Sequence, residues 1–309
     1  MIQVVNYHHM YEKLTAIIPE EDVMVDEPLR NHTYTHLGGM ADFLVTPETY
    51  EQVQQIVKLA NRETIAFTLL GKGSNLIVKD GGIRGIVMNL KRLKEITTDE
   101  TTLVAQSGAR IIDASRAALK HNLSGLEFSC GIPGSVGGAL YMNAGAYGGE
   151  IKDVLVSTVV VDRDGELRTL TAEELDLDYR TSNIPDNDYI VLEATFGLKT
   201  GEHKDIKAVM DDLTHKRETK QPLEYPSCGS VFKRPPGFFA GKLIQDSHLQ
   251  GKQIGGAQVS WKHAGFIVNV NEATASEYIN LIHFVQDTVK EKFDVNLERE
   301  VRIIGEDLI

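Results

Sequence analysis

Two glycine-rich segments constrain this chain of 309 residues more than any other feature of its sequence. The first, Gly71-Lys72-Gly73-Ser74-Asn75, directly follows the apolar run 66–70, and the second spans residues 131–149. Glycine permits positive φ and lets backbone N–H groups converge on an anion. Two such segments favour a large phosphorylated cofactor over a pair of tight turns. Neither matches the GxGxxG or GxxxxGK[ST] phosphate-binding patterns.

Strands and helices alternate around these segments. Apolar spacing predicts a helix that begins at Thr46-Pro47 and buries Val53, Ile56, Val57 and Ala60, and a second helix at 111–121. Strands are predicted at 66–70, 86–90 and 101–107, and a hairpin at 154–170 turns at Asp164-Gly165. The run Thr171-Ala172-Glu173-Glu174 predicts a capping box that opens a short helix.

The pattern changes after residue 200. Ile206, Val209, Met210 and Leu213 predict an amphipathic helix, which a glycine- and proline-rich basic stretch follows. Thr274 and Glu277 predict the cap of a last long helix with Tyr278, Ile282, Val285 and Val289 on one face. A strand is predicted at 299–304. We therefore predict an α+β fold with a short helix and extended lead-in at 1–30, a cofactor-binding domain at 31–200 and a C-terminal domain at 201–309.

Composition excludes several classes of protein. A net charge of −12 disfavours a nucleic-acid binder, because neutralising phosphates needs a basic surface. Residues 216–262 nevertheless carry eight Lys or Arg against three acids, which would steer an anionic substrate unless these cations are only a solvated surface. The two cysteines form no CxxC and the histidines no HExxH, so no metal site is predicted. No signal peptide and no apolar run of about 20 residues is found, which predicts a cytoplasmic protein without a membrane partner.

The glycine segments, with Leu37-Gly38-Gly39-Met40-Ala41-Asp42 before them, resemble the vanillyl-alcohol-oxidase or PCMH-type FAD-binding domain. More narrowly, residues 30–305 resemble the UDP-N-acetylenolpyruvoylglucosamine reductase family. The resemblance implies a two-part FAD-binding domain followed by a smaller α+β substrate-binding domain, non-covalent FAD, NADPH as hydride donor, and a monomer that supplies peptidoglycan synthesis. The residues it implies for FAD binding are Gly71, Lys72, Gly73, Ser74, Asn75, Leu76, Gly131, Pro133, Gly134, Ser135, Gly137, Gly138, Asn143, Ala144 and Gly145.

Three further segments match that family: 179–182, 229–233 and 297–302. By resemblance, Arg180, Ser230 and Glu300 are the catalytic residues. Their chemistry fits reduction of an enol ether conjugated to a carboxylate, since cationic and hydrogen-bonding groups stabilise the enediolate-like charge that develops. Arg180 would pair with the carboxylate. Ser230 would donate a proton to carbon, and Glu300 would act as a second acid or orient the carboxylate.

The resemblance also implies substrate contacts, with Lys220 and Arg217 near the pyrophosphate and Lys233 and Tyr147 as further candidates. Ser260, His263 and Asn269 match a block near the flavin, although His263 fits a core histidine equally well. Two departures stand out: Arg234 replaces an asparagine common in the family, and the short stretch between Arg180 and Ser230 lacks the loop that covers substrate in one subgroup. The chain therefore resembles the loop-less second type.

Other functions stay open at this point. An FAD-dependent oxidase or dehydrogenase of the same fold would turn over with oxygen and would not prefer a UDP-sugar. A non-catalytic flavin-binding module would not be reduced by NADPH. A nucleophilic Cys228 would need an activating partner that the sequence does not supply.

Overall fold

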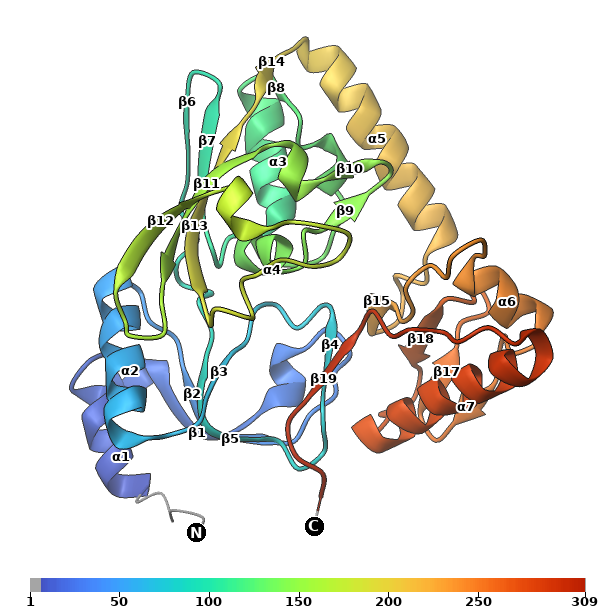
Figure 1. Cartoon of the computed structure of the whole chain (residues 1–309), viewed down its shortest axis with the longest axis horizontal. Helices are drawn as coiled ribbons and strands as arrows, with labels where there is room; N and C mark the ends of the chain where they lie inside the picture. The colour runs from blue at the N-terminus through green and yellow to red at the C-terminus, as the bar shows by residue number, and fades with distance from the viewer. Residues whose placement is uncertain (1–6, 309) are drawn as a thin grey trace. The chain divides into compact units, whose positions relative to one another are not determined.

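The computed structural model describes residues 7–308, which divide by their internal contacts into two compact units (Figure 1). Within the described range, the first unit holds residues 7–25, 42–72 and 85–216, and the second holds 26–41, 73–84 and 217–308. Each unit mixes helices and strands, so the predicted α+β class is confirmed. The units are discontinuous in sequence, and the domain limits at residues 30 and 200 stay a prediction.

One sheet, most of whose residues belong to the first unit, has the strand order β1-β2-β5-β3. Its strands are β1 (Val23–Pro28), β2 (Met40–Val45), β5 (Ile83–Met88) and β3 (Phe67–Leu69), and β3 runs parallel to β5. The helices α1 (Tyr7–Thr15) and α2 (Tyr50–Glu63) share a buried core with this sheet, which includes Leu14, Phe43 and Ile56. The strands predicted at 66–70 and 86–90 are confirmed within a few residues, and α1 and β1 fit the predicted short helix and extended lead-in, whereas β2 had no prediction.

Helix α2 begins later than the predicted start at Thr46-Pro47. Thr49 is its N-cap: the Thr49 hydroxyl accepts a hydrogen bond from the Gln52 amide (3.2 Å), and the Gln52 side chain accepts one from the Thr49 amide (3.3 Å). Thr46 instead donates from its hydroxyl to Asp22 (2.7 Å). The predicted apolar residues at 53, 56, 57 and 60 are all buried, because helical spacing places them on one face.

The other sheet of the first unit is antiparallel in the order β12-β11-β13-β7-β6. Its strands are β12 (Leu167–Thr171), β11 (Leu155–Val161), β13 (Ile190–Gly197), β7 (Thr102–Gln106) and β6 (Ile96–Asp99). Helices α3 (Ile111–Lys120) and α4 (Val136–Tyr141) pack against it and share its buried core. The predicted hairpin and the helix at 111–121 are confirmed. Thr171 and Glu174 exchange the hydrogen bonds of the predicted capping box, but the helix that follows is only the 3₁₀ turn Glu173–Leu175.

Two short antiparallel pairs complete the first unit. Strand β8 (Leu123–Ser124) pairs with β14 (Lys199–Thr200), and β9 (Gly145–Ala146) pairs with β10 (Gly149–Glu150). Helix α5 (His203–Lys220) follows β14. Its Ile206, Met210 and Leu213 are buried as predicted, but Val209 is 48% exposed, so that prediction was wrong. Val209 lies on the same face at i+3, but the rest of the protein covers that face only at Ile206, Met210 and Leu213.

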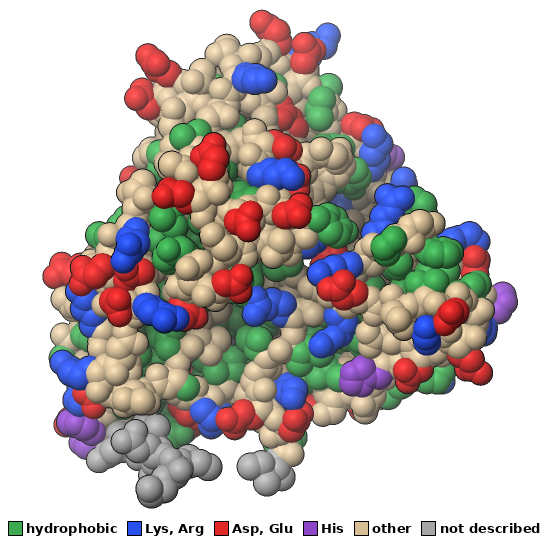
Figure 2. Space-filling view, in the orientation of Figure 1, with side chains coloured by type: hydrophobic (Ala, Val, Ile, Leu, Met, Phe, Trp, Pro, Cys, Tyr) green, Lys and Arg blue, Asp and Glu red, His purple; other side chains and the backbone are tan. Residues whose placement is uncertain are grey.

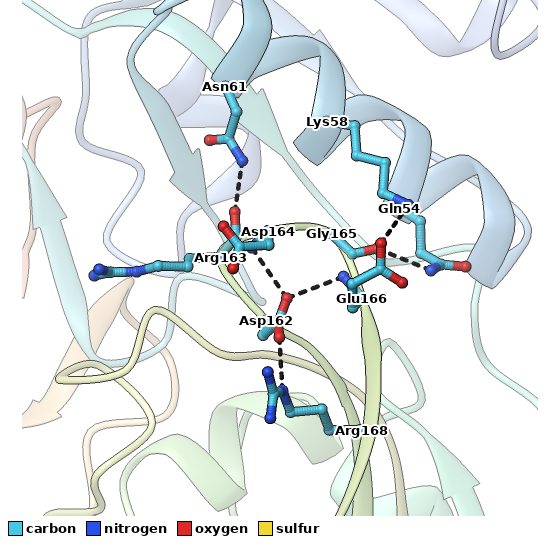
Figure 3. A network of polar contacts seen from close by, with 9 residues as sticks. All are labelled: Gln54, Lys58, Asn61, Asp162, Arg163, Asp164, Gly165, Glu166 and Arg168. Carbon is cyan, nitrogen blue, oxygen red and sulfur yellow. Dashed lines mark hydrogen bonds and ion pairs between the residues drawn. The ribbon is translucent and has the colours of Figure 1, made fainter.

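The turn between β11 and β12 is organised by one buried carboxylate, Asp162 (Figure 3). Its Oδ1 accepts hydrogen bonds from the amides of Asp164 (3.0 Å) and Glu166 (2.9 Å), and its Oδ2 accepts one from Arg168 Nε (2.6 Å). Burial alone would raise the pKa of Asp162, but these three donors outweigh burial and hold its pKa below the ordinary value. The turn is therefore built around an ionised carboxylate.

Helix α2 packs against the same turn through three side chains, all drawn in Figure 3. Gln54 donates to the carbonyl of Gly165 (2.8 Å), and Asn61 donates to that of Arg163 (2.5 Å). Lys58 pairs with Glu166 at 2.8 Å. The turn thus links the two layers of the first unit.

We expect Asp162→Ala to lower the free energy of unfolding by about 1.5–3 kcal/mol, because it removes the acceptor of two amides and one guanidinium. Asp164→Ala, in the same turn but exposed, is the control and should change stability by less than about 0.5 kcal/mol. A carboxyl whose pKa is depressed by folding stabilises the protein above its unfolded pKa, about 3.9, and this contribution is lost as pH falls through the folded pKa. In urea unfolding, the difference in free energy of unfolding between wild type and Asp162→Asn should therefore shrink as the pH falls into the acid range. A difference that does not change with pH would contradict this.

The second unit is centred on a four-stranded antiparallel sheet, β15-β18-β17-β16. Its strands are β15 (Ser227–Ser230), β18 (Phe266–Asn269), β17 (Ala257–Val259) and β16 (Gln253–Ile254). Helices α6 (Ala240–Asp246) and α7 (Ala275–Phe293) enclose a buried core with it. A separate parallel pair joins β4 (Leu76–Val78) to β19 (Arg302–Ile304).

Helix α7 begins at the predicted capping box. Thr274 and Glu277 exchange side-chain-to-amide hydrogen bonds of 3.1 and 3.0 Å, and Asp80 accepts from the amides of Ala275 and Ser276, both at 2.8 Å. The predicted face of Tyr278, Ile282, Val285 and Val289 is fully buried. Among residues 7–308, no helix combines the length and the apolar character needed to cross a bilayer.

Candidate functional site

The first glycine segment connects β3 to β4 and is shared between the units: Gly71 and Lys72 belong to the first, and Gly73–Leu76 to the second. In the second unit, Gly73 has φ +65°, and a Cβ built on it would lie 2.7 Å from Thr33 Cα and 2.8 Å from the His32 carbonyl oxygen. Tyr34 donates its amide to the Gly73 carbonyl (3.1 Å). Position 73 therefore accepts only glycine, and this holds the amides of residues 73–75 in a tight turn.

The second glycine segment lies wholly in the first unit. Ser135 caps α4, its hydroxyl accepting from the Gly138 amide (3.2 Å), and a Cβ on Gly71 would lie 3.3 Å from that hydroxyl oxygen. Gly137 approaches Ser107 so closely that a Cβ would lie 2.0 Å from the Ser107 hydroxyl. Gly131, Pro133, Gly134 and Gly138 belong to the same run. The structure thus brings together Gly71 and Ser135, which are 64 positions apart in the sequence.

A pocket of about 570 Å³ opens in the first unit beside these loops. Its lining includes Lys72, Lys91, Lys94 and Arg110, with the backbone of Gly108 and Ala109. The Val136 amide donates to the Ala109 carbonyl (2.8 Å), so the pocket adjoins the second glycine segment. Sequence reasoning missed residues 91, 94 and 110. The basic run after β5 and the Gly108-Ala109-Arg110 turn before α3 were the signals available.

Asn143, Ala144 and Gly145 continue the glycine segment. The Asn143 side chain is fully engaged within the protein: its Nδ2 donates to Glu150 (2.8 Å) and to the Asp178 carbonyl (3.0 Å), and its Oδ1 accepts from the Lys152 amide (2.9 Å). Asn143 therefore shapes the loop with its side chain, and only its backbone is available to a cofactor in this arrangement.

Arg180 is held against the same loop. Its Nη2 donates to the Gly145 carbonyl (2.9 Å), and its guanidinium lies 5.6 Å from the centre of the Tyr179 ring. Arg180, Asn143 and Tyr147 all have positive φ, at 57°, 39° and 55°. The Tyr147 side chain is exposed.

Ser230 and Glu300 lie on neighbouring backbone segments of the second unit. Ser230 ends β15, and the Glu300 amide donates to the carbonyl of the next residue, Val231 (2.8 Å). The side chain of Asn75, in the glycine segment, donates to the Glu300 carbonyl (3.3 Å), and the backbone carbonyl of Asn75 accepts from the Arg302 amide (3.2 Å). The amides of Glu300 and Val301 turn toward Val231, so β19 begins only at Arg302 and is shorter than predicted. One backbone junction therefore gathers a glycine-loop residue and two candidate catalytic residues.

Several cations of the basic stretch 216–262 are neutralised by neighbouring acids, which the count of charges in that stretch did not predict. Several of its cations pair with acids: Lys216 with Asp212 (2.5 Å), Lys233 with Glu298 (2.6 Å), Lys242 with Asp246, and Lys262 with Glu224 (3.8 Å). Figure 2 shows lysine, arginine and acidic side chains interspersed over the face drawn. Lys220, exposed at the end of α5, and Arg217 lie on the last turn of that helix. Arg234 stacks on Phe239, 4.0 Å from its ring centre.

Ser260, His263 and Asn269, the block predicted to lie near the flavin, form hydrogen bonds within the second unit. Ser260 accepts from the amides of Lys262 and His263, and Asn269 donates to the Thr35 carbonyl (3.0 Å). Burial lowers the pKa of His263, whose Nδ1 accepts from the Gly265 amide (3.1 Å). His263 is therefore neutral near pH 7, and its ring packs on Phe266.

Cys228 is buried, and burial raises its pKa to about 11. Its neighbour is the Tyr278 hydroxyl at 3.3 Å rather than a base. A thiol in this state is a poor nucleophile, which disfavours the Cys228 alternative. Within residues 7–308, no three His, Cys, Asp or Glu side chains are grouped as metal ligands.

Comparisons with known proteins agree on one family. Residues 221–304 match the model of the UDP-N-acetylenolpyruvoylglucosamine reductase C-terminal domain, and residues 41–171 match an FAD-binding domain. UDP-N-acetylenolpyruvoylglucosamine reductase of Oceanobacillus iheyensis is 74% identical over 97% of this chain and 98% of its own length. A Bacillus cereus reductase 2 is 64% identical over 98% and 99%. The crystal structure of the Thermus caldophilus enzyme aligns with a TM-score of 0.79 at 32% identity, covering 91% of this chain and 99% of that one.

Proposed function

Because this chain belongs to the UDP-N-acetylenolpyruvoylglucosamine reductase family, we propose that it reduces UDP-N-acetylglucosamine enolpyruvate to UDP-N-acetylmuramate, with FAD as hydride carrier and NADPH as donor. The observation that carries the proposal is the junction of Asn75, Val231 and Glu300. Its hydrogen bonds connect the first glycine segment to Glu300 and to the strand end that carries Ser230, the residues whose chemistry suits the substrate. The product is a peptidoglycan precursor.

The chain's residues fit a non-covalent FAD. Backbone amides of Gly73, Ser74 and Asn75, with Lys72, would hold the phosphates, since a tight turn of amides attracts anions. Ser135, Gly137 and Gly138 at the start of α4 would line the cofactor where a side chain has no room. The pocket at Lys72, Lys91 and Arg110, whose lining holds five cations against the acids Glu21, Asp22 and Asp113, would take part of the phosphorylated end. When bound, FAD supplies the hydride that reaches the substrate's terminal alkene carbon.

The three catalytic residues would divide the remaining work. The Arg180 guanidinium would pair with the substrate carboxylate and stabilise the charge that develops beside it, because its planar fork stays protonated and matches a carboxylate. The Ser230 hydroxyl would pass its proton to the carbon next to that carboxylate. Glu300, whose backbone is fixed to Val231, would orient the carboxylate or act as a second acid.

We place the substrate's pyrophosphate at Lys220, with Arg217, Lys233 and Tyr147 as further contacts. The NADPH nicotinamide would use the same site in turn, which accounts for the lack of a second dinucleotide motif. We further propose a cytoplasmic monomer that needs no nucleic acid or membrane, with FAD bound by residues 31–200 and substrate by 201–309.

Lys220→Ala is expected to raise KM for the UDP-sugar, and for NADPH, by roughly tenfold, the value of one charge-assisted contact. The kcat should change little, because a uniform binding contact acts alike on ground and transition states. The control is Lys207→Ala, a lysine on the same helix that pairs with Asp211 at 2.5 Å and should leave both KM values unchanged. Steady-state kinetics with each ligand varied decide this. An unchanged KM in Lys220→Ala makes Lys220 a solvated surface charge.

An anaerobic stopped-flow experiment tests the function as a whole. NADPH should bleach the flavin absorbance of the wild-type protein, and the enolpyruvyl UDP-sugar should then restore it. Reoxidation by oxygen or a sugar alcohol, but not by the enolpyruvyl compound, would instead support an oxidase of the same fold. Failure of NADPH to bleach the flavin would leave only a binding module.

A further inference from the structure

The strand that presents Ser230 contains a β-bulge. Ser227 pairs with Val268 and Ser230 pairs with Phe266, so Cys228 and Gly229 together lie opposite the single residue Ile267. Gly229 has φ +77°, a conformation that L side chains rarely adopt. Bulges of this kind redirect a side chain near an active site.

The extra residue determines which face of the strand carries Ser230. In a regular strand, residues 228 and 230 would point to the same face, because side chains alternate. Cys228 lies in the buried core of the second unit. Val231, three residues later, lies in the same core, although regular alternation would place it on the opposite face from Cys228. The insertion flips the alternation, as a register shift of one residue does. Ser230 consequently leaves the core and is partly exposed.

One side chain touches both strands at the bulge. Tyr278 of α7 donates its hydroxyl to the Ile267 carbonyl (2.5 Å), and the same oxygen lies 3.3 Å from Cys228 Sγ. Tyr278 is fully buried, and burial raises its pKa well above the ordinary value. The phenol therefore keeps its proton near neutral pH and can donate to the Ile267 carbonyl.

We propose that Tyr278 is a positioning residue for the reductase reaction: its hydroxyl holds the bulge at Ile267 and Cys228 and thereby aims Ser230 at the substrate. The proposal rests on the proposed role of Ser230. Glu300 depends on the same element, because its amide bonds to Val231, the residue after Ser230. Removing the Tyr278 hydroxyl would therefore affect the reaction by displacing the bulge, and with it Ser230 and Glu300.

The test is Tyr278→Phe in the FAD-loaded enzyme, measured by anaerobic stopped flow in both half-reactions. Reduction of the flavin by NADPH should keep its wild-type rate. Reoxidation by the enolpyruvyl UDP-sugar should slow about 10- to 100-fold, the usual consequence of a small misplacement of a reacting group. Val285→Ala, a cavity in the same buried core, is the control for lost stability and should alter neither half-reaction. Equal slowing of both half-reactions, or no slowing, would overturn the proposal.

The double variant Tyr278→Phe with Ser230→Ala asks whether Tyr278 acts through Ser230. It should reoxidise no more slowly than Ser230→Ala alone, because the group being aimed is already absent. Additive slowing would show that Tyr278 acts by another route. A wild-type enzyme that the enolpyruvyl compound cannot reoxidise would contradict the proposed function instead, so the two failures are distinguishable.

If Tyr278→Phe does not fold, Gly229→Ala perturbs the same bulge from β15. Its matched control is Gly237→Ala, since both glycines have φ +77° and a Cβ on either meets nothing within 4 Å. Backbone strain is thus equal in the two variants. Slow reoxidation in Gly229→Ala alone supports the proposal, and identical kinetics in the two variants would overturn it.

Discussion

Ser230→Ala should bind FAD and accept hydride from NADPH at close to the wild-type rate, while its reoxidation by the enolpyruvyl UDP-sugar slows by about 10²- to 10⁴-fold. That range is typical of losing a positioned general acid. The two half-reactions separate because the Ser230 proton is needed only when the substrate carbon is protonated. Anaerobic stopped-flow traces at the flavin absorbance measure each step in turn.

Isotope labelling provides the companion measurement. In wild-type enzyme, solvent deuterium should appear at the carbon beside the carboxylate, and a label carried on NADPH should appear at its neighbour. Ser227→Ala is a suitable control, because it removes a hydroxyl at the other end of the same strand, before the bulge, and should preserve both rates within a small factor. Comparable slowing of both half-reactions in Ser230→Ala would assign Ser230 a structural role. Normal turnover would leave Glu300 or water as the acid.

Gly73→Val should yield a folded protein that is purified almost without flavin and has lost at least about 100-fold of its activity. The added Cβ would lie 2.7 Å from Thr33 Cα and 2.8 Å from the His32 carbonyl oxygen, both backbone atoms that cannot move cheaply. The residue would also have to hold φ +65°, which costs a β-branched side chain more than most. The loop must therefore move, and its amides no longer converge on the cofactor phosphates.

The matched control for Gly73→Val is Gly237→Val. Gly237 has φ +77°, but a Cβ on it would meet nothing within 4 Å, so this variant carries the backbone strain without the collision. Flavin content per protein, read from the visible absorbance after gel filtration, should fall only in Gly73→Val. Heat should release FAD from the wild type. Full flavin occupancy in Gly73→Val would show that the first glycine segment does not bind the cofactor.

Elements with a strong local signal were predictable from the sequence. Helices α2 and α7 follow from apolar spacing and capping boxes, and the hairpin of β11 and β12 follows from alternation around Asp164-Gly165. These signals are local, because a cap or a turn is satisfied by residues a few positions apart. Strands β1 and β2 lack such a signal, and their pairing depends on partners distant in sequence.

The candidate site was predictable only as a set of residue types in a given order. The glycine segments and the segments around Arg180, Ser230 and Glu300 could be read directly, and they indicated the family that the comparisons support. Which side chains form hydrogen bonds within the protein, and which line a pocket, could not be predicted from the sequence. Asn143, Ser260 and Asn269 form hydrogen bonds within the protein, and Lys91, Lys94 and Arg110 came to attention only through the pocket that they line.

The sequence by itself determined which chemical groups this protein carries and where its helices and turns begin, because those properties depend on neighbouring residues. Only the tertiary structure decided which groups meet. Asn75 reaches the Glu300 carbonyl across 225 positions, and Tyr278 reaches Cys228 across 50. The face that carries Ser230 depends on one extra residue opposite Ile267, and no local pattern encodes that pairing. Such contacts form between groups distant in sequence because burying the apolar core forces the chain segments together.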